Sequence, residues 1–249
     1  MGTPLLPLLV GCGLLAFGPS IAFLWVVVSQ RAQLVIIALS GAFFWLTAIL
    51  LSALVWYLFF NLTGAPKLYG VIIPISVAIQ EYMRYLLYVA YVKAETAIRK
   101  VTTPTATLPL HDITSSLAGG VGFGTMQGVI MYGSVLAASS GPSVLFSESC
   151  PHMPLVFLSA VTCLCFIVLH TMLMIAAFVS FRRQNRAGVG MICAAHLAAS
   201  YITVINTVQD GCRASLPLLV ILVTAVSAFV ILRIRDRSFP VTHGLVNPQ

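Results

Sequence analysis

The sequence contains little charge. Only 8% of its 249 residues are charged, and aspartate and glutamate together number 6, whereas soluble domains usually contain about 25% charged residues. With 59% apolar residues and a mean hydropathy of +1.02, this composition excludes an ordinary soluble enzyme. The apolar stretches are long and continuous, unlike the short alternating segments of a membrane β-barrel. They predict an all-α polytopic membrane protein whose helices satisfy their own backbone hydrogen bonds.

Aspartate is missing from the apolar segments, because Asp112, Asp210 and Asp236 all lie in loops or at segment edges. An intramembrane aspartyl protease works with a pair of aspartates, so this chain does not carry that chemistry. The dipeptide Gly133-Ser134 is too ordinary to indicate the activated serine of an intramembrane serine protease. The sequence also lacks an internal repeat of three spans plus three, which disfavours an inverted-repeat transporter.

Seven segments are long and apolar enough to cross a bilayer, since a spanning helix needs about 20 apolar residues. Short polar runs separate them, and no low-complexity linker divides the chain. Residues 1–249 are therefore predicted to form one seven-span membrane domain. The predicted spans are 5–28, 34–60, 69–92, 113–139, 155–181, 187–208 and 214–232.

The distribution of lysine and arginine predicts the orientation, because these residues in short loops are retained on the cytosolic side. With the N-terminus on the lumenal or extracellular side, two cations, Lys67 and Arg213, lie in lumenal loops. The cytosolic loops and the C-terminal tail then hold ten: Arg31, Lys93, Arg99, Lys100, Arg182, Arg183, Arg186, Arg233, Arg235 and Arg237. The net charge of +7 is thus explained by the topology, and it favours contact of the cytosolic loops with the anionic lipids of the inner leaflet. It does not indicate nucleic-acid binding.

Ionisable side chains inside predicted spans are costly and are functional candidates by default. The third span carries Glu81 and Arg84, three residues apart on one helix face, with Gln80 beside them; His170 and His196 lie in the fifth and sixth spans. At about 1.5 Å per residue, Glu81 and both histidines lie at ~14–16 Å depth. We therefore expect an intramembrane polar network of Gln80, Glu81, Arg84, His170 and His196, in which Glu81 pairs with Arg84 and the two histidines face one another.

Three interpretations of this layer are open. It could be a structural network that ties the third, fifth and sixth spans together. Two histidines and a glutamate are also a known zinc ligand set, and a glutamate can activate water. A polar cavity or water path is the third interpretation. The spacing His-Glu-x-x-His, which would make the metal interpretation strong, is absent from the sequence.

The fourth predicted span carries Gly120, Gly124 and Gly128, a doubled G-x-x-x-G pattern. At this spacing the glycines share one helix face and allow another helix backbone to approach closely. This face is predicted to dock a helix, either of a partner protein or of the same chain.

Two of the six cysteines, Cys150 and Cys212, fall in predicted lumenal loops. The lumen is an oxidising compartment, so these two residues could form a disulfide. The sequence does not give their separation, which decides the question. The other four cysteines lie in predicted spans, where they are expected to pack as small apolar residues.

Short motifs in six of the seven predicted spans, taken together and in order, resemble the anterior pharynx-defective family of γ-secretase subunits. These motifs are Phe17-Gly18-Pro19, Gly41-Ala42-Phe43-Phe44-Trp45-Leu46, Gln80-Glu81 with Arg84, the glycines 120, 124 and 128, Leu169-His170-Thr171 and His196-Leu197. The resemblance implies a seven-span, non-catalytic scaffold that assembles with nicastrin, presenilin and the presenilin enhancer, presenilin supplying both catalytic aspartates. It further implies that the glycine face serves assembly, and that His170 and His196 support packing and the activity of the complex.

That family takes part in intramembrane proteolysis of type I membrane proteins, including Notch signalling, in the endoplasmic reticulum, the Golgi, the plasma membrane and endosomes. It implies no cofactor and no metal. The family is also distantly similar to polytopic prenyl-protein endopeptidases, which use adjacent glutamates where this chain has Gln80 and Glu81. The alternative hypothesis is therefore a glutamate- or metal-dependent membrane endopeptidase using Glu81, His170 and His196. A seven-span receptor shares the topology but has no ligand-sensing signature here.

Overall fold

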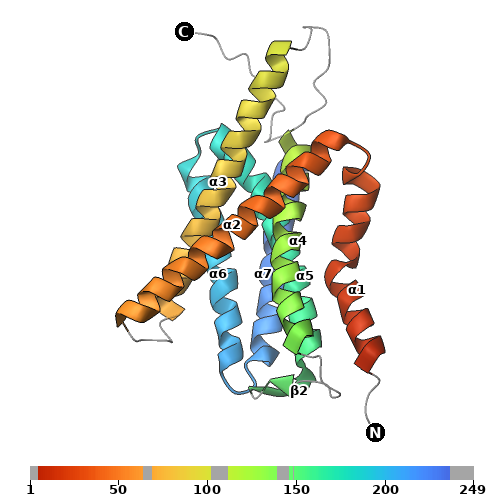
Figure 1. Ribbon diagram of the computed structural model, residues 1–249, viewed down its shortest axis with the longest axis vertical. Helices are drawn as coiled ribbons and strands as arrows, with labels where there is room; N and C mark the ends of the chain where they lie inside the picture. The colour runs from red at the N-terminus through yellow and green to blue at the C-terminus, as the bar shows by residue number, and fades with distance from the viewer. Residues whose placement is uncertain (1–4, 64–68, 102–111, 139–145, 148, 236–249) are drawn as a thin grey trace.

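The computed structural model describes residues 5–63, 69–101, 112–138, 146–147 and 149–235. Within these residues the chain forms seven α-helices that run alternately up and down, with a short hairpin between the fourth and fifth (Figure 1). Lys67 and Arg237, two of the cations that predict the orientation, lie outside the described residues. The helices are α1 (Leu5–Phe23, extended by a π-helical turn Leu24–Val28), α2 (Ala32–Thr63), α3 (Tyr69–Val101), α4 (Asp112–Ala138), α5 (Leu155–Arg182), α6 (Arg186–Val204, extended by a 3-10 turn Ile205–Thr207) and α7 (Cys212–Arg235).

Each helix coincides with one predicted apolar segment. The largest difference is at α3, which continues to Val101 instead of ending near residue 92. Charged residues such as Lys93 and Glu95 limit how deep a segment lies in a membrane, but they are good helix formers and do not end the helix. Five helices (α1, α2, α5, α6 and α7) are long and apolar enough to cross a membrane. The helix α3 carries several charged residues, and α4 carries glycines and small polar residues.

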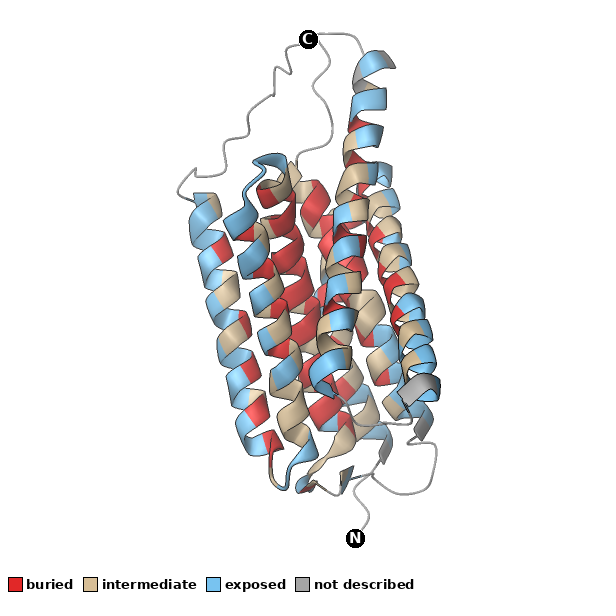
Figure 2. Ribbon diagram, turned by 90° about the vertical axis from the view of Figure 1, so that its left-hand side faces the viewer, coloured by how far each residue is buried: buried red, intermediate tan, exposed pale blue. Residues whose placement is uncertain are grey.

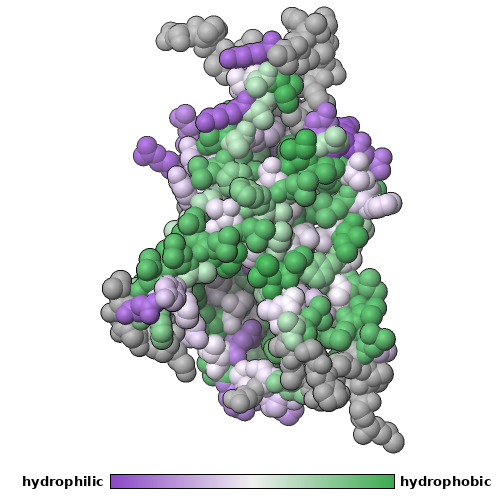
Figure 3. Space-filling view, in the orientation of Figure 1, coloured by the Kyte–Doolittle hydropathy of each residue, from purple (hydrophilic) through white to green (hydrophobic). Residues whose placement is uncertain are grey.

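The surface has the character of a membrane protein. Apolar side chains cover most of the face seen in Figure 3, and hydrophilic ones gather towards its two ends. Large apolar residues such as Trp25, Ile36 and Leu50 are more than 60% exposed, which is stable only where lipid or another protein covers them. The arginines near the α1–α2 and α5–α6 connections and at the end of α7 lie at one end of the bundle, and Arg213 lies at the other.

The helix α5 is at the centre of the bundle. It contacts α1, α3, α4, α6 and α7, and most of its residues are buried, as the red ribbon in Figure 2 shows. One apolar cluster on α5, built around Leu169 and Leu173, packs against α6 and α7. A second, around Met174 and Phe178, packs against α2, α3 and α4. One helix thus packs against both groups of helices, including α3 and α6, which carry other side chains of the candidate site described below.

The hairpin at the N-terminal end of α5 consists of β1 (Phe146–Ser147) and β2 (Cys150–Pro154), paired antiparallel with an irregular register. Cys150 in β2 forms a disulfide with Cys212, the first residue of α7, with the two Cα atoms 6.3 Å apart. The Ser149 hydroxyl donates to the Asn206 carbonyl oxygen at 2.6 Å, and the Asp210 N–H donates to the Ser149 carbonyl oxygen. The disulfide and these hydrogen bonds fix the hairpin to the α6–α7 connection.

Candidate functional site

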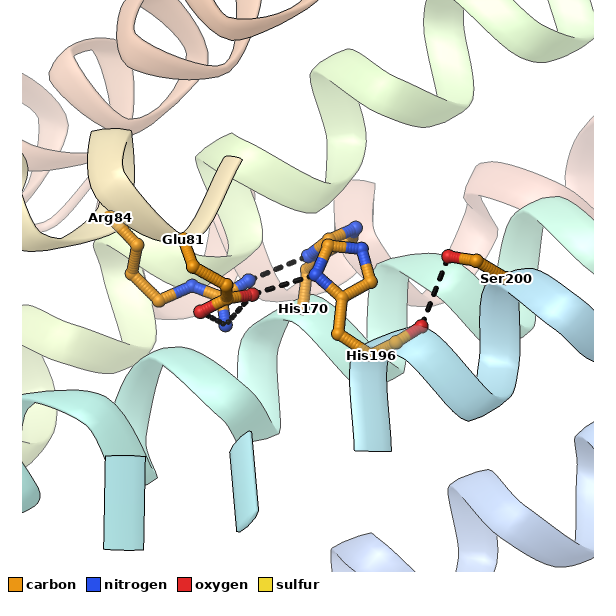
Figure 4. A network of polar contacts seen from close by, with 5 residues as sticks. All are labelled: Glu81, Arg84, His170, His196 and Ser200. Atoms are coloured by element: carbon orange, nitrogen blue, oxygen red, sulfur yellow. Dashed lines mark hydrogen bonds and ion pairs between the residues drawn. The ribbon is translucent and has the colours of Figure 1, made fainter. Parts of the chain in front are cut away.

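Four ionisable residues meet in the interior of the bundle. Glu81 and Arg84 come from α3, His170 from α5 and His196 from α6, and their side chains point towards one another (Figure 4). We call these four residues the polar cluster. The three helices that carry it are therefore joined by side-chain hydrogen bonds at the same level of the bundle.

Glu81 and Arg84 form an ion pair, in which Nη1 of Arg84 lies 3.1 Å from Oε1 and from Oε2 of Glu81. The spacing of three residues places both side chains on one face of α3. The Oε1 atom of Glu81 also lies 2.6 Å from Nδ1 of His196. Nη2 of Arg84 lies 2.8 Å from Nδ1 of His170. Each histidine is thus bonded to α3, while their rings lie edge to face with the centroids 4.8 Å apart.

The hydrogen-bond partners define which ring nitrogens carry protons. Arginine can only donate, so Nδ1 of His170 accepts from Arg84, and the proton of the neutral ring is on Nε2. The carboxylate of Glu81 accepts, so Nδ1 of His196 donates to it. The charges of Glu81 and Arg84 balance each other within the polar cluster. A balanced and hydrogen-bonded set is the arrangement in which charges are tolerated in a low-dielectric interior.

The polar cluster is enclosed by aromatic rings and by the helices themselves. The side chains of Arg84 and Glu81 are 0% and 11% exposed. The guanidinium of Arg84 lies over the ring of Phe123 in α4, 5.3 Å from its centroid, a favourable cation–π geometry. The ring of Phe123 also lies against His170. Enclosure on this scale strengthens the hydrogen bonds inside the cluster, because water does not screen them.

Some buried polar atoms near the cluster have no hydrogen-bond partner within the described ranges. They are Nε of Arg84, Nε2 of His170 and Oε1 of Gln80. Gln80, which was predicted to belong to the network, thus lies beside the cluster with its carbonyl oxygen unpaired in the part of the chain that the structure describes. A buried polar group without a partner costs about 1–3 kcal/mol, so these atoms are where an ordered water would be stabilised.

The donor set of the cluster does not fit a metal ion. Both carboxylate oxygens of Glu81 face Arg84, and the Nδ1 lone pair of His170 accepts from the same guanidinium. A divalent cation in this position would have to displace a buried arginine whose charge repels it. Among the described residues, no group of three or more His, Cys, Asp or Glu side chains is arranged to hold a metal. Glu81 is likewise occupied by two partners, which is a poor arrangement for a general base.

The glycines of α4 allow close helix contact on the face that they share. A Cβ atom on Gly120 would lie 2.8 Å from Cα of Thr171, and one on Gly124 would lie 2.9 Å from Cα of Ile167. A Cβ on Gly128 would lie 2.6 Å from Sγ of Cys163. Real Cβ atoms do not approach so closely, so this face packs against the backbone of α5. The sequence left open whether this glycine face docks a helix of a partner protein or of the same chain. In the structure it docks α5 of the same chain.

A second glycine face of α4 meets α2. A Cβ atom on Gly122 would clash with the carbonyl oxygen of Ala38, and one on Gly41 in α2 would clash with that of Gly119. This contact could not be predicted from a four-residue glycine spacing, because Gly41 and Gly122 lie on different helices and follow no such spacing. The helix α4 is therefore held between α2 and α5 at backbone distance on both sides.

A second ion-pair cluster, which the sequence did not predict, lies at the end of α5. Nη2 of Arg182 lies 2.8 Å from Oε2 of Glu95 in α3, and Nε lies 2.7 Å from Oδ2 of Asp112 in α4. The hydroxyl of Tyr91 donates to Asp112 at 3.0 Å. Glu95, Asp112 and Arg182 stand in polar stretches that resemble loops in the sequence. The continuation of α3 beyond residue 92 is what brings Glu95 to Arg182.

Comparison with known proteins identifies the family. A family model described as Aph-1 protein matches residues 8–236. The chain belongs to the Aph-1 family. The resemblance drawn from the motifs is thereby confirmed, and the polar cluster, the α4 glycines and both cysteines of the disulfide of this Aph-1 family member all lie inside the matched range.

Relatives of this Aph-1 family member come from animals and plants. The chain is 32% identical over 235 residues to the Drosophila melanogaster gamma-secretase subunit Aph-1, covering 94% of this chain and 96% of that protein. It is 32% identical over 209 residues to the Danio rerio gamma-secretase subunit Aph-1b, covering 81% and 80%. It is 28% identical over 215 residues to the Arabidopsis thaliana gamma-secretase subunit APH1-like, covering 84% and 86%.

Proposed function

We propose that this chain is a non-catalytic scaffold subunit of a γ-secretase complex. Its relatives are named gamma-secretase subunits, and the observation that carries the non-catalytic role is the engagement of Glu81 by Arg84 and His196. The glutamate that could have acted as a catalytic group instead bonds Arg84 on its own helix and His196 on α6. The catalytic aspartates of the complex would then belong to a presenilin-like chain, with nicastrin-like and presenilin-enhancer-like chains as further partners.

The proposed topology is seven membrane spans with the N-terminus lumenal or extracellular and the C-terminus cytosolic. The seven alternating helices support it, as do the arginines that gather at one end of the bundle. In this orientation Cys150 and Cys212 lie on the oxidising side, as their disulfide requires. As part of the complex, the chain would be found in the endoplasmic reticulum, the Golgi, the plasma membrane and endosomes, where it would support proteolysis of type I membrane proteins, including those of Notch signalling.

The polar cluster and the glycines have distinct roles in this proposal. The polar cluster fixes the register of α3, α5 and α6, because its hydrogen bonds form only when the three helices are at the same level. Gly120, Gly124 and Gly128 set the distance between α4 and α5. Partner helices would bind to outer faces of the bundle, whose shape depends on this inner packing. The glycines therefore serve assembly through the shape of the chain and not through direct contact with a partner.

The first experiment is mass spectrometry of the proteins that co-purify with the full chain in mild detergent. The scaffold hypothesis expects a chain with two intramembrane aspartates and a nicastrin-like chain in stable proportion. Gly124→Leu is expected to abolish their co-purification, because Gly124 lies against the backbone of Ile167. Gly133→Leu on the same helix is the matched control, since nothing lies within 4 Å of a Cβ at that position. Normal assembly of Gly124→Leu would refute the role given to the glycine face.

Glu81→Gln distinguishes the scaffold from the membrane endopeptidase that the sequence left as the alternative. In the scaffold, the amide keeps one acceptor oxygen, replaces the other with an NH2 donor and loses the charge. Proteolysis by the complex is then expected to be reduced in proportion to the amount of complex assembled. An endopeptidase that uses Glu81 would lose turnover completely with assembly intact. Loss of proteolysis per assembled complex to the background level would therefore overturn the proposal.

A further inference from the structure

A groove lies between α5, α6 and α7 in the half of the bundle next to the α5–α6 connection. Its volume is about 540 Å³, within the range of sites that bind small molecules. Most of its lining is apolar, for example Leu173 and Ala176 from α5, Ile192 and Ala195 from α6, and Phe229 from α7. Phe229 is 44% exposed, so the groove opens to the outside of the bundle.

Alanines create the space between these helices. Ala194 on α6 and Ala225 on α7 line the groove and present only a methyl group to it. From Leu173 to Arg183 the groove follows α5 for about 15 Å, which is about half of the ~30 Å thickness of a bilayer core. The groove therefore matches the length of one leaflet.

The open end of the groove is positively charged. Arg183 and Arg233 line it, and the guanidinium of Arg233 lies over the ring of Phe229, 5.1 Å from its centroid. No acidic side chain belongs to the lining within the described residues. An apolar channel that ends in two arginines is complementary to an amphipathic anion.

We propose that this groove binds an anionic glycerophospholipid, with one acyl chain along the apolar walls and the phosphate-bearing headgroup at Arg183 and Arg233. The site is distinct from general attraction of the basic loops to lipid, because it requires both the groove and the two arginines. It rests on the proposed function only in that the proposed topology places this end of the bundle in the cytosolic leaflet, where anionic lipids are enriched.

The test is native mass spectrometry of the full chain, titrated with phosphatidylserine or with phosphatidylcholine that has identical acyl chains. We expect tighter binding of phosphatidylserine to the unsubstituted chain. The double variant Arg183→Gln/Arg233→Gln is expected to weaken phosphatidylserine binding about 30-fold. Arg31→Gln/Arg213→Gln removes the same charge away from the groove and is expected to bind as the unsubstituted chain does.

A second pair of variants tests the groove without changing charge. Ala194→Leu/Ala225→Leu fills it, and is expected to weaken binding of phosphatidylserine. Ala198→Leu/Ala228→Leu is the matched control, because both residues are exposed on the same helices and are not part of the groove lining. Equal binding of the two lipids, an equal loss in the two arginine variants, or unchanged binding after filling the groove would each overturn the proposal.

Co-purification of partner chains, measured on the same preparations, separates this proposal from the proposed function. Loss of lipid binding with assembly retained supports the groove as a lipid site. Absence of partner chains from the unsubstituted protein would refute the scaffold function, whereas the lipid titration would still decide the site.

Discussion

Nη2 of Arg84 lies 2.8 Å from Nδ1 of His170, and this hydrogen bond joins α3 to the central helix α5 in the interior of the bundle. The same guanidinium pairs with Glu81, which in turn bonds His196 on α6. Arg84 thus balances the charge of Glu81 and also bonds His170 of α5 to α3. Its side chain is 0% exposed, so no solvent replaces these contacts if they are lost.

Arg84→Met is expected to destabilise the chain by about 3–5 kcal/mol, because it leaves Glu81 as an uncompensated buried charge. The measurement is the unfolding free energy or melting temperature of the purified chain in detergent. The double variant Glu81→Gln/Arg84→Met removes both charges and should recover part of the loss. If the double variant were less stable than Arg84→Met, the ion pair would not be the source of the effect.

His170→Asn is expected to be milder than His170→Leu. The Oδ1 atom of asparagine can take the place of Nδ1 and accept from Arg84, whereas leucine leaves the charged donor unpaired at a cost of about 1–3 kcal/mol or more. Melting temperatures of the two variants, measured in the same detergent, give the comparison. Equal destabilisation by both substitutions would show that packing against Phe123, and not the hydrogen bond, is what His170 contributes.

Gly124→Ala is expected to destabilise the chain by about 1–3 kcal/mol, because the added methyl group lies 2.9 Å from the backbone of Ile167 and forces α4 away from α5. Gly133→Ala, on the same helix and facing open space, should be neutral or stabilising by up to about 1 kcal/mol through helix propensity. Thermal unfolding of both variants tests the contrast. Similar melting temperatures would contradict the close α4–α5 contact.

The disulfide between Cys150 and Cys212 closes a loop of 62 residues in sequence, which corresponds to a contribution of about 4 kcal/mol in the loop-entropy model. Cys150→Ser/Cys212→Ser, or reduction of the unsubstituted chain, should lower the melting temperature in proportion. Cys193→Ser, which removes a cysteine that is not in a disulfide, serves as the control. A chain whose melting temperature does not respond to reduction would exclude a stabilising role for this bond.

The sequence predicted much of the fold and part of the site. The length of the apolar segments predicted the positions of all seven helices, and the three-residue spacing predicted the ion pair of Glu81 and Arg84. The equal depth of His170 and His196 in the membrane predicted that they lie close together, and their ring centroids are 4.8 Å apart. The partner of each histidine, however, is on α3. That detail depends on how far each helix is rotated about its axis, which one sequence does not specify.

Other contacts could not be predicted because their partners are distant in the chain and ordinary in type. Glu95, Asp112 and Arg182 each resemble a solvated charge at the edge of a span, and only the tertiary structure brings them together. The contact of Gly122 with Ala38 follows no regular spacing of glycines. The hairpin before α5 contains Pro151 and Pro154, which indicate a break in a helix but not a strand pairing.

The central position of α5 has a consequence for mapping where other proteins touch this chain. Of the apolar stretch by which α5 could cross a membrane, 67% is buried inside the chain, compared with 17–28% for the corresponding stretches of α1, α2, α6 and α7. Photo-crosslinking groups placed along α5 would therefore report mainly on the interior of the same molecule. Groups placed on outward-facing positions such as Ile36, Leu50 or Ile221 would capture whatever neighbours surround the bundle in a native membrane.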